Sequence, residues 1–244
     1  PGAGSDLAAL QLRATADGDD YVLNGSKIWT THAHFANRMF CLVRTSTEGK
    51  PQAGISFLLL DMATSGITVE PIRTLAGDHE FNQVFFDDVR VPQAKRLGAE
   101  NAGWSVAKHL LTFERGGKYA PGLIGRLERL RARGDVDPVL RAQLDREAIN
   151  LRALQALELK AMRGVGGSTA LYASALKILG TESAQRIDVL GCEIEGYAAW
   201  ADADGQTPDN IATTVPRYLN ARAATIYAGS NEIQRDLVAR AILG

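Results

Sequence analysis

The spacing of apolar residues changes once along this chain of 244 residues, and that change limits the folds open to it. Up to about residue 98, apolar and polar residues alternate over short runs, as they do in strands. From about residue 101 the spacing becomes three and four, which is the period of a helix. Strand-like runs without intervening helical patterns indicate an antiparallel barrel or sandwich. We therefore predict an α+β protein with an antiparallel β domain over 1–98 and an antiparallel four-helix bundle over 99–244.

Turn-forming residues separate the predicted strands. Asn24 and Gly25 have the composition of a tight hairpin turn, and Asp87 and Asp88 that of a solvated turn. A hairpin at Asn24 would deliver the segment that follows it to a rigid place. The strand-like runs are 11–16, 20–23, 38–44, 54–60 and 82–86.

Four helices are predicted in the second half of the chain. Gly116, Gly117 and Pro121 interrupt the first of them. Asp137 followed by Pro138 is typical of a helix start, with a capping acid and then proline in the first turn. We expect helices over 101–132, 137–163, 168–190 and 209–242, with the first and last broken.

Composition and charge exclude several classes of function. The net charge is −1 with 23% charged residues and no long run of one sign, which argues against a nucleic-acid partner and against a polybasic membrane anchor. The apolar runs are too short to span a bilayer. Cys41 and Cys192 lie far apart, with no metal-type spacing. We expect a cytoplasmic protein.

Residues 27–32, with the sequence KIWTTH, carry the first sign of a ligand site. A planar indole beside short hydroxyl side chains suits a flat heterocycle with polar edges, and a flavin is one such ligand. The alternative is a core Trp29 with threonines filling a strand. The hexapeptide alone favours that alternative, as for any short motif.

Four segments together resemble the acyl-CoA dehydrogenase family of flavoproteins. They are PGAGSD at 1–6, NGSKIWTT at 24–31, FERG at 113–116 and IYAGSNEIQR at 226–235, and they occur in this order. The resemblance covers nearly the whole chain, as the family's middle β domain and C-terminal helical domain. It implies that the family's N-terminal helical domain would lie upstream of Pro1.

The resemblance implies a bound FAD and names residues that would hold it. Trp29 would lie against the isoalloxazine ring, and Thr31 would form a hydrogen bond near the flavin N5. Ser5 would lie near the flavin and the pantetheine arm of the thioester. Ser230 would approach the pyrophosphate, since a small hydroxyl at a helix start can bind a phosphate oxygen. For Ser5 the alternative is a simple turn or cap.

The catalytic base departs from the commoner family pattern. Many members carry a glutamate where this chain has Ala228, whose methyl group cannot accept a proton. A minority place the base on the first helix of the C-terminal domain, and the matching residue is Glu114. Trp104, Ala107 and Leu111 precede it at helical spacing, so Glu114 shares an apolar face, and we expect its pKa to be raised. The alternative is an acid paired with Arg115 or another arginine.

A second departure concerns the cofactor. Many relatives have an Arg-x-x-Phe-Gly motif that reaches FAD across a dimer, and no such Phe-Gly occurs in 127–138. Arg131 or Arg133 would then supply the charge for the pyrophosphate, or one cofactor site is degenerate. His32 and His34 lack a third ligand nearby, so no metal site is predicted.

The predicted function is FAD-dependent α,β-dehydrogenation of an acyl-CoA thioester. Glu114 would remove the α-proton, the β-hydride would pass to flavin N5, and electrons would continue to an electron-transfer flavoprotein. Family assemblies are usually dimers of dimers, so we expect a homo- or hetero-oligomer.

Three alternatives stay open. The first is a catalytically degenerate partner subunit of a mixed assembly, such as one that acts on steroid side-chain CoA thioesters. The second is a different reaction on the same scaffold, that of an acyl-CoA oxidase or a flavin monooxygenase. The third is a non-catalytic interaction protein, which would leave the ordered motifs unexplained.

Overall fold

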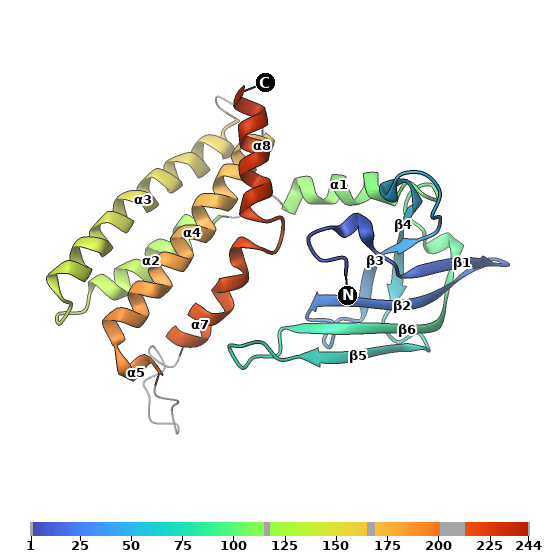
Figure 1. Ribbon diagram of the computed structural model, residues 1–244, viewed down its shortest axis with the longest axis horizontal. Helices are drawn as coiled ribbons and strands as arrows, with labels where there is room; N and C mark the ends of the chain where they lie inside the picture. Colours follow the sequence, from blue (N-terminus) through green and yellow to red (C-terminus); the bar gives the residue numbers. More distant parts are fainter. Residues whose placement is uncertain (1, 115–117, 165–168, 201–212, 244) are drawn as a thin grey trace. The chain divides into compact units, whose positions relative to one another are not determined.

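The computed structural model describes residues 2–114, 118–164, 169–200 and 213–243. The chain divides into two compact units, Pro1–Phe113 and Glu114–Gly244. The first unit is a six-stranded sheet followed by one helix, and the second is helical (Figure 1). The predicted α+β class, with strands first and helices after, is confirmed.

The first unit contains six strands in the order β4-β3-β1-β2-β6-β5. All neighbouring strands pair antiparallel except β1 and β3, which are parallel where Arg13 pairs with Arg44. Strand β5 was missed in the sequence because its proline and its exposed residues obscure the alternation. The strands are β1 (Arg13–Asp17), β2 (Asp20–Thr31), β3 (Arg38–Arg44), β4 (Ile55–Asp61), β5 (Ile67–Ile72) and β6 (Phe81–Pro92).

Three short 3-10 helices and one α-helix complete this unit. Helix α1 buries Ala107 against Leu10, Leu42, Ile55 and Phe57. Because these partners come from the β unit, α1 groups with the sheet by its contacts. The domain boundary at 98/99 stays a prediction. The bounds are η1 (Leu7–Ala9), η2 (Pro51–Gly54), η3 (Gln93–Lys95) and α1 (Gly103–Glu114).

The predicted hairpin turn at Asn24 and Gly25 is wrong. Both residues lie in the middle of β2, where Asn24 pairs with Arg13 of β1. The true hairpin turn lies between β1 and β2, where Asp17 pairs with Asp20 and Gly18 has a φ of 59°.

The predicted turn at Asp87 and Asp88 is also wrong. These residues lie inside β6, at a shift of register against β2. Asp88 has a φ of 48°, and its carboxylate accepts a hydrogen bond of 2.9 Å from the Asn24 amide. Polar residues that resemble turn formers thus lie at a β-bulge, which sequence spacing cannot distinguish from a turn.

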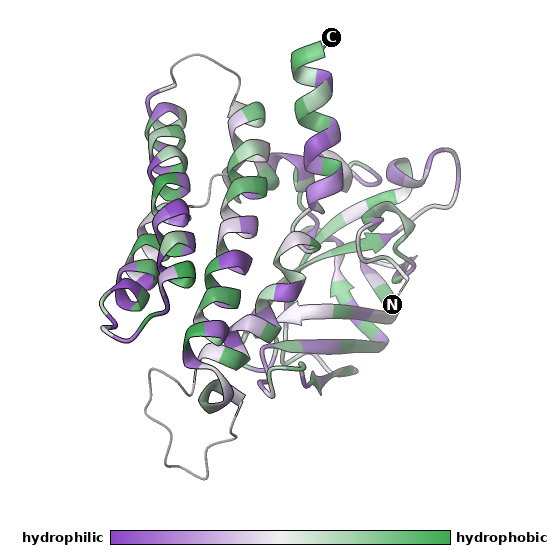
Figure 2. Ribbon diagram, turned by 60° about the vertical axis from the view of Figure 1, so that its left-hand side comes forward, coloured by the Kyte–Doolittle hydropathy of each residue, from purple (hydrophilic) through white to green (hydrophobic). Residues whose placement is uncertain are grey.

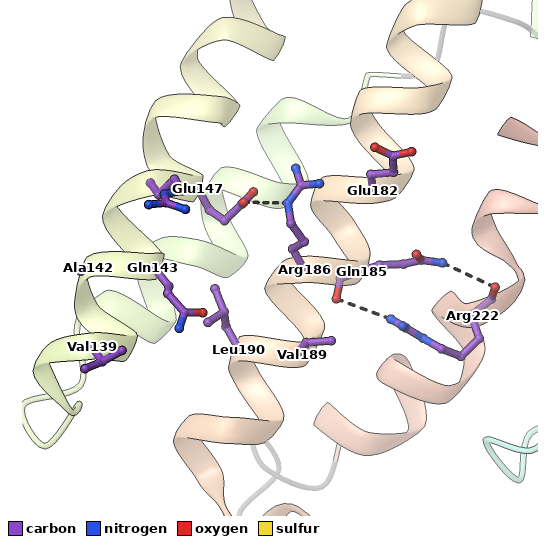
Figure 3. A pocket seen from close by; sticks show the side chains of 11 residues that line it. Val139, Ala142, Gln143, Glu147, Glu182, Gln185, Arg186, Val189, Leu190 and Arg222 are labelled. Atoms are coloured by element: carbon purple, nitrogen blue, oxygen red, sulfur yellow. Dashed lines mark hydrogen bonds and ion pairs between the residues drawn. The ribbon is translucent and has the colours of Figure 1, made fainter. Parts of the chain in front are cut away.

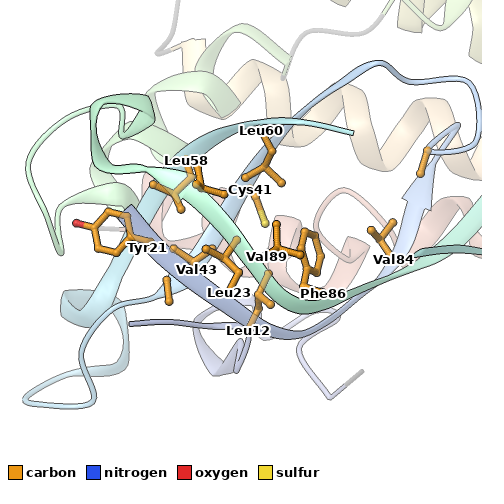
Figure 4. Close-up of a cluster of buried hydrophobic side chains, with 13 residues drawn as sticks. Leu12, Tyr21, Leu23, Cys41, Val43, Leu58, Leu60, Val84, Phe86 and Val89 are labelled. Carbon is orange, nitrogen blue, oxygen red and sulfur yellow. The ribbon is translucent and has the colours of Figure 1, made fainter. Parts of the chain in front are cut away.

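A buried apolar cluster holds the sheet together (Figure 4). Leu23 and Val89 are fully buried at paired positions of β2 and β6. Tyr21 is 1% exposed, and its hydroxyl donates to Glu100 at 2.8 Å, so burial of the ring leaves the hydroxyl satisfied.

The second unit is a bundle built on long helices. Helix α3 packs against α2 and α4 over a core that includes Leu127, Leu144, Leu151 and Ile187. Hydrophobic and hydrophilic residues alternate along these helices (Figure 2). The helices are α2 (Ala120–Arg131), α3 (Pro138–Met162), α4 (Thr169–Glu195), α5 (Tyr197–Trp200), α7 (Thr214–Ala221) and α8 (Asn231–Leu243), with the 3-10 turn η4 (Arg222–Thr225).

The ends of these helices are fixed by side chains. Asp137 caps α3, as its sequence predicts, by accepting a hydrogen bond of 2.8 Å from the Val139 amide. Glu158 of α3 is 7% exposed and accepts from the amides of Tyr119 at 2.6 Å and Ala120 at 3.0 Å, at the start of α2. A buried carboxylate therefore satisfies the first turn of α2.

Candidate active site

The predicted flavin-contacting residues lie at a bulge near the end of β2. Lys27 pairs with Val84 and Thr30 with Asn82, so two residues of β2 face a single residue of β6. Within this bulge Trp29 has a φ of 63°. A non-glycine residue in that region is strained by about 1–3 kcal/mol, and such strain gathers at functional sites.

The bulge presents the Trp29 indole at the surface. The residue is 56% exposed, and its ring meets Phe81 edge-on, with centroids 6.1 Å apart and an interplanar angle of 82°. An indole held at one edge and open over more than half of its surface can stack on a planar ligand. The alternative of a core tryptophan is wrong.

Thr31 and Ser5 are both exposed in the same unit. Thr31 is the last residue of β2 and pairs with Phe81. His32 follows with a φ of 55°, and its amide donates to the Glu80 carbonyl at 2.8 Å, which holds the chain where it leaves the sheet. Ser5 lies just before η1. Thr31 is thus close in sequence and in space to Trp29, while the role of Ser5 stays a prediction.

Glu114 is the last residue of α1, and its side chain lies outside the described residues. Two residues of the predicted apolar face lie on the same cluster, with Ala107 buried and Trp104 packed against it, whereas Leu110 takes part there in place of the predicted Leu111. The assignment of Glu114 as the base stays a prediction.

Ser230 lies directly before α8, after Ala228 and Gly229, which have φ values of 53° and 85°. Its hydroxyl accepts a long hydrogen bond of 3.4 Å from the Ile233 amide, so it acts as a helix cap. The cap leaves the hydroxyl partly buried at the N-terminus of a 13-residue helix, a place that favours anions. Its contact with a pyrophosphate stays a prediction.

The two arginines considered as pyrophosphate ligands are both close to acids. Arg131 contacts Asp145 at 2.8 Å and Glu128 at 3.2 Å. Arg133 lies 3.6 Å from Asp135 and 3.8 Å from Glu195. Either arginine would have to exchange a carboxylate for a phosphate, which weakens the idea that they replace the missing motif.

Two polar residues that matter here were missed in the sequence. Asn82 is fully buried at the bulge, and Lys177 of α4 is 8% exposed with its ammonium donating to the Ala224 carbonyl. Burial lowers the pKa of Lys177. The sequence does contain an indication for Asn82. It alternates with Val84 and Phe86, so the strand pattern predicts that its side chain is buried with theirs.

A groove of about 710 Å³ lies on the helical unit (Figure 3). It lies between α3, α4 and η4, and it contains no predicted site residue. Arg186 and Glu147 form an ion pair of 2.7 Å in its wall. The lining residues are Val139, Ala142, Gln143, Arg146, Glu147, Glu182, Gln185, Arg186, Val189, Leu190 and Arg222.

Within the described ranges, no helix is long and apolar enough to cross a membrane. In the same part of the chain, no three histidine, cysteine or acidic side chains gather as a metal site would require.

Comparison with known proteins identifies the family. Residues 1–89 match the acyl-CoA dehydrogenase middle domain, and residues 101–243 match the acyl-CoA dehydrogenase C-terminal domain. The chain belongs to the acyl-CoA dehydrogenase family. The resemblance drawn from the four sequence motifs is therefore confirmed.

One curated relative and two solved structures show how similar the chain is to individual family members. The chain is 37% identical to acyl-CoA dehydrogenase IpdE1 of Mycobacterium tuberculosis, over 100% of this chain and 64% of the relative. Among solved structures, it resembles one in the ChsE4-ChsE5 complex from Mycobacterium tuberculosis with a TM-score of 0.88 and 31% identity, over 100% of this chain and 66% of that one. It resembles the Tcur3481-Tcur3483 steroid ACAD with a TM-score of 0.85 and 30% identity, over the same shares. The chain thus spans about two thirds of their length.

Proposed function

We propose that this chain forms part of a FAD-dependent acyl-CoA dehydrogenase, with Glu114 as the base. The observation that carries the proposal is the bulged end of β2, which presents an exposed indole and an exposed threonine hydroxyl two residues apart. These are the positions at which the family motif would hold a flavin, and a planar, polar-edged ring suits them.

The chain's own residues have separate tasks in this proposal. Trp29 and Thr31 would hold the isoalloxazine, and Ser230, at the N-terminus of α8, would bind the pyrophosphate. The Glu114 carboxylate would remove the α-proton of the thioester and retain it on its oxygen. FAD, when bound, supplies the acceptor for the hydride that leaves the β-carbon. An electron-transfer flavoprotein is the proposed final acceptor.

Glu114→Gln tests the proposed base. The amide keeps the shape of the side chain and cannot take a proton, so turnover should fall by about 10²–10⁴-fold while FAD binding is retained. Glu70→Gln is a matched control, since Glu70 is an exposed acid of β5. Turnover should be measured with acyl-CoA thioesters of several sizes, and binding from the visible flavin absorption. Normal turnover in the Glu114 variant would remove that residue from the mechanism.

A second candidate is a partner subunit of a mixed assembly that acts on steroid side-chain CoA thioesters. Ala228 in place of the commoner glutamate and the ion-paired Arg131 and Arg133 favour it. The resemblance to one chain of the ChsE4-ChsE5 complex and to a steroid ACAD also supports it.

The colour of the purified protein separates the two candidates. A yellow preparation whose flavin absorption is bleached by substrate under anaerobic conditions supports the dehydrogenase. A colourless chain that is inert alone, and gains flavin and activity only with a second subunit, supports the partner. Steroid side-chain and linear fatty acyl-CoA thioesters should be compared as substrates in each case.

A further inference from the structure

The side chain of Asn82 connects the bulge to two histidines outside it. Asn82 is fully buried at the start of β6, opposite Thr30. Its amide nitrogen donates to the Thr30 carbonyl at 3.0 Å. Its amide oxygen lies 2.7 Å from His79 Nε2 and 3.1 Å from His34 Nδ1. One side chain thus joins three segments of the chain.

These contacts fix which way the amide points. A carbonyl oxygen only accepts, so both imidazoles must donate to it, from Nε2–H of His79 and from Nδ1–H of His34. The NH₂ group is then turned toward Thr30. The two imidazole rings stack with centroids 3.9 Å apart and an interplanar angle of 21°, which holds them on the same oxygen.

The anchored residue is the one between Trp29 and Thr31. Thr30 resumes the regular pairing after the bulge, so its carbonyl is the first fixed point beyond the strained Trp29. A backbone held there determines the direction of both neighbouring side chains. Loss of the Asn82 side chain would remove a hydrogen bond from the partly buried Thr30 carbonyl and would let the bulge rearrange.

We infer that Asn82, with its amide oriented by His34 and His79, is a positioning residue for the ring-binding pair Trp29 and Thr31. The inference rests on the proposed function, since it takes these two residues as the flavin-holding pair. Asn82 touches neither ligand nor reacting atoms in this scheme and acts through the Thr30 backbone.

The wild-type protein provides a test that needs no cofactor. Nitrogen-15 NMR of labelled histidines reports which ring nitrogen carries the proton, and substitution of each of the four histidines assigns the signals. At mildly alkaline pH we expect neutral His34 protonated at Nδ1 and neutral His79 at Nε2. The Nδ1–H form is the less common one in water. A His34 ring protonated only at Nε2 would overturn the inference.

Asn82→Asp tests the consequence for the ring site. Aspartate keeps the acceptor for both histidines and replaces the donor to Thr30 by an oxygen that repels the carbonyl. We expect FAD to bind at least tenfold more weakly, with a shifted flavin spectrum in the remaining complex. Gln83→Leu removes the neighbouring amide, whose side chain reaches Ser26 at 3.4 Å, and should change FAD binding less than twofold.

The outcomes separate this inference from the proposed function. Wild-type affinity and spectrum in the Asn82→Asp variant would overturn the inference while leaving the function intact. A wild-type chain that binds no FAD, alone or with a second subunit, would overturn the function, and the tautomer measurement would still decide whether the anchor exists. If the aspartate variant does not fold, Asn82→Ser and the tautomer measurement decide.

Discussion

The two units hold their key segments by different means. In the β unit, the Trp29 bulge is held by strand pairing and by the neutral side chain of Asn82. In the helical unit, buried charged side chains hold such segments in place, as Glu158 does at the start of α2. Among the described residues, the three buried side-chain oxygens without a hydrogen-bond partner belong to Glu147, Asp188 and Glu195, all in the helical unit.

This difference predicts how each unit responds to pH. A neutral side chain such as that of Asn82 does not change its charge over the pH range where carboxylates titrate. A buried carboxylate, by contrast, lowers the stability of the fold when it is ionised and its charge is not fully compensated. The helical unit should therefore be the more pH-sensitive of the two, and the following experiments test that expectation.

The largest effect is expected at the buried pair of Arg126 and Asp188. These side chains contact at 2.8 Å, and the Asp188 side chain is 2% exposed. Arg126→Met would remove the hydrogen-bonded partner of a buried charge and should lower the free energy of unfolding by about 3–5 kcal/mol. Urea denaturation followed by circular dichroism measures the loss.

The pH dependence of that variant sharpens the test. Burial raises the pKa of Asp188, and Arg126 is the largest influence that lowers it. Without Arg126 the folded-state pKa rises further, so the stability that the protonated acid provides is present at low pH and lost as pH rises through that value. Arg126→Met should therefore lose more stability at pH ~8 than at pH ~5. As a control, Leu23→Ala in the β core should lose about 2–5 kcal/mol equally at both pH values. A pH-independent loss in the Arg126 variant would contradict the comparison.

A smaller effect is expected at the Glu158 cap. Glu158→Leu removes the acceptor for two amides at the start of α2 and should cost about 1–3 kcal/mol. Glu158→Gln retains an acceptor oxygen and should cost less. Hydrogen exchange at Tyr119 and Ala120 reports the local opening directly. Equal losses in the two variants would show that the charge, and not the acceptor, stabilises this helix start.

The smallest effect is expected at Cys41, in the apolar core of the β unit. Burial raises the pKa of this thiol to about 11 from 9.0. The thiolate fraction near neutral pH should thus fall about a hundredfold, and alkylation of the native protein should slow accordingly. Stability from this group is present below pH ~9 and lost as pH rises through the folded-state value. Cys192→Ser isolates the Cys41 signal, and rapid alkylation of that variant under native conditions would refute the prediction.

Sequence patterns predict much of this fold because most elements follow regular periods. The change of period near residue 98 separates strands from helices, and the Asp137 cap marks the start of α3 correctly. Trp29 and Thr31, which the family motifs single out, lie on one exposed strand end, and their contact with a flavin stays a prediction. The motifs alone do not reveal the geometry of that end.

The misses come from contacts between residues far apart in the sequence. Asn24 has the composition of a turn residue, yet its side-chain amide donates a hydrogen bond to Asp88, 64 residues away. No local pattern singles out Glu158, whose carboxylate accepts from two amides at the start of α2. In each case the local propensity is ordinary, and a tertiary partner decides the role of the side chain.

The bulge at Trp29 changes the parity of its strand. Before it, odd-numbered residues such as Tyr21 and Leu23 face the core, and after it Thr30 pairs with the buried Asn82 while Thr31 is exposed. If the regular pairing continued past Lys27 without a bulge, Thr31 would face the core as Leu23 does, and its hydroxyl would be enclosed. Because of this bulge, the first half of β2 packs side chains into the hydrophobic core, while the end of the same strand exposes the Thr31 hydroxyl to solvent.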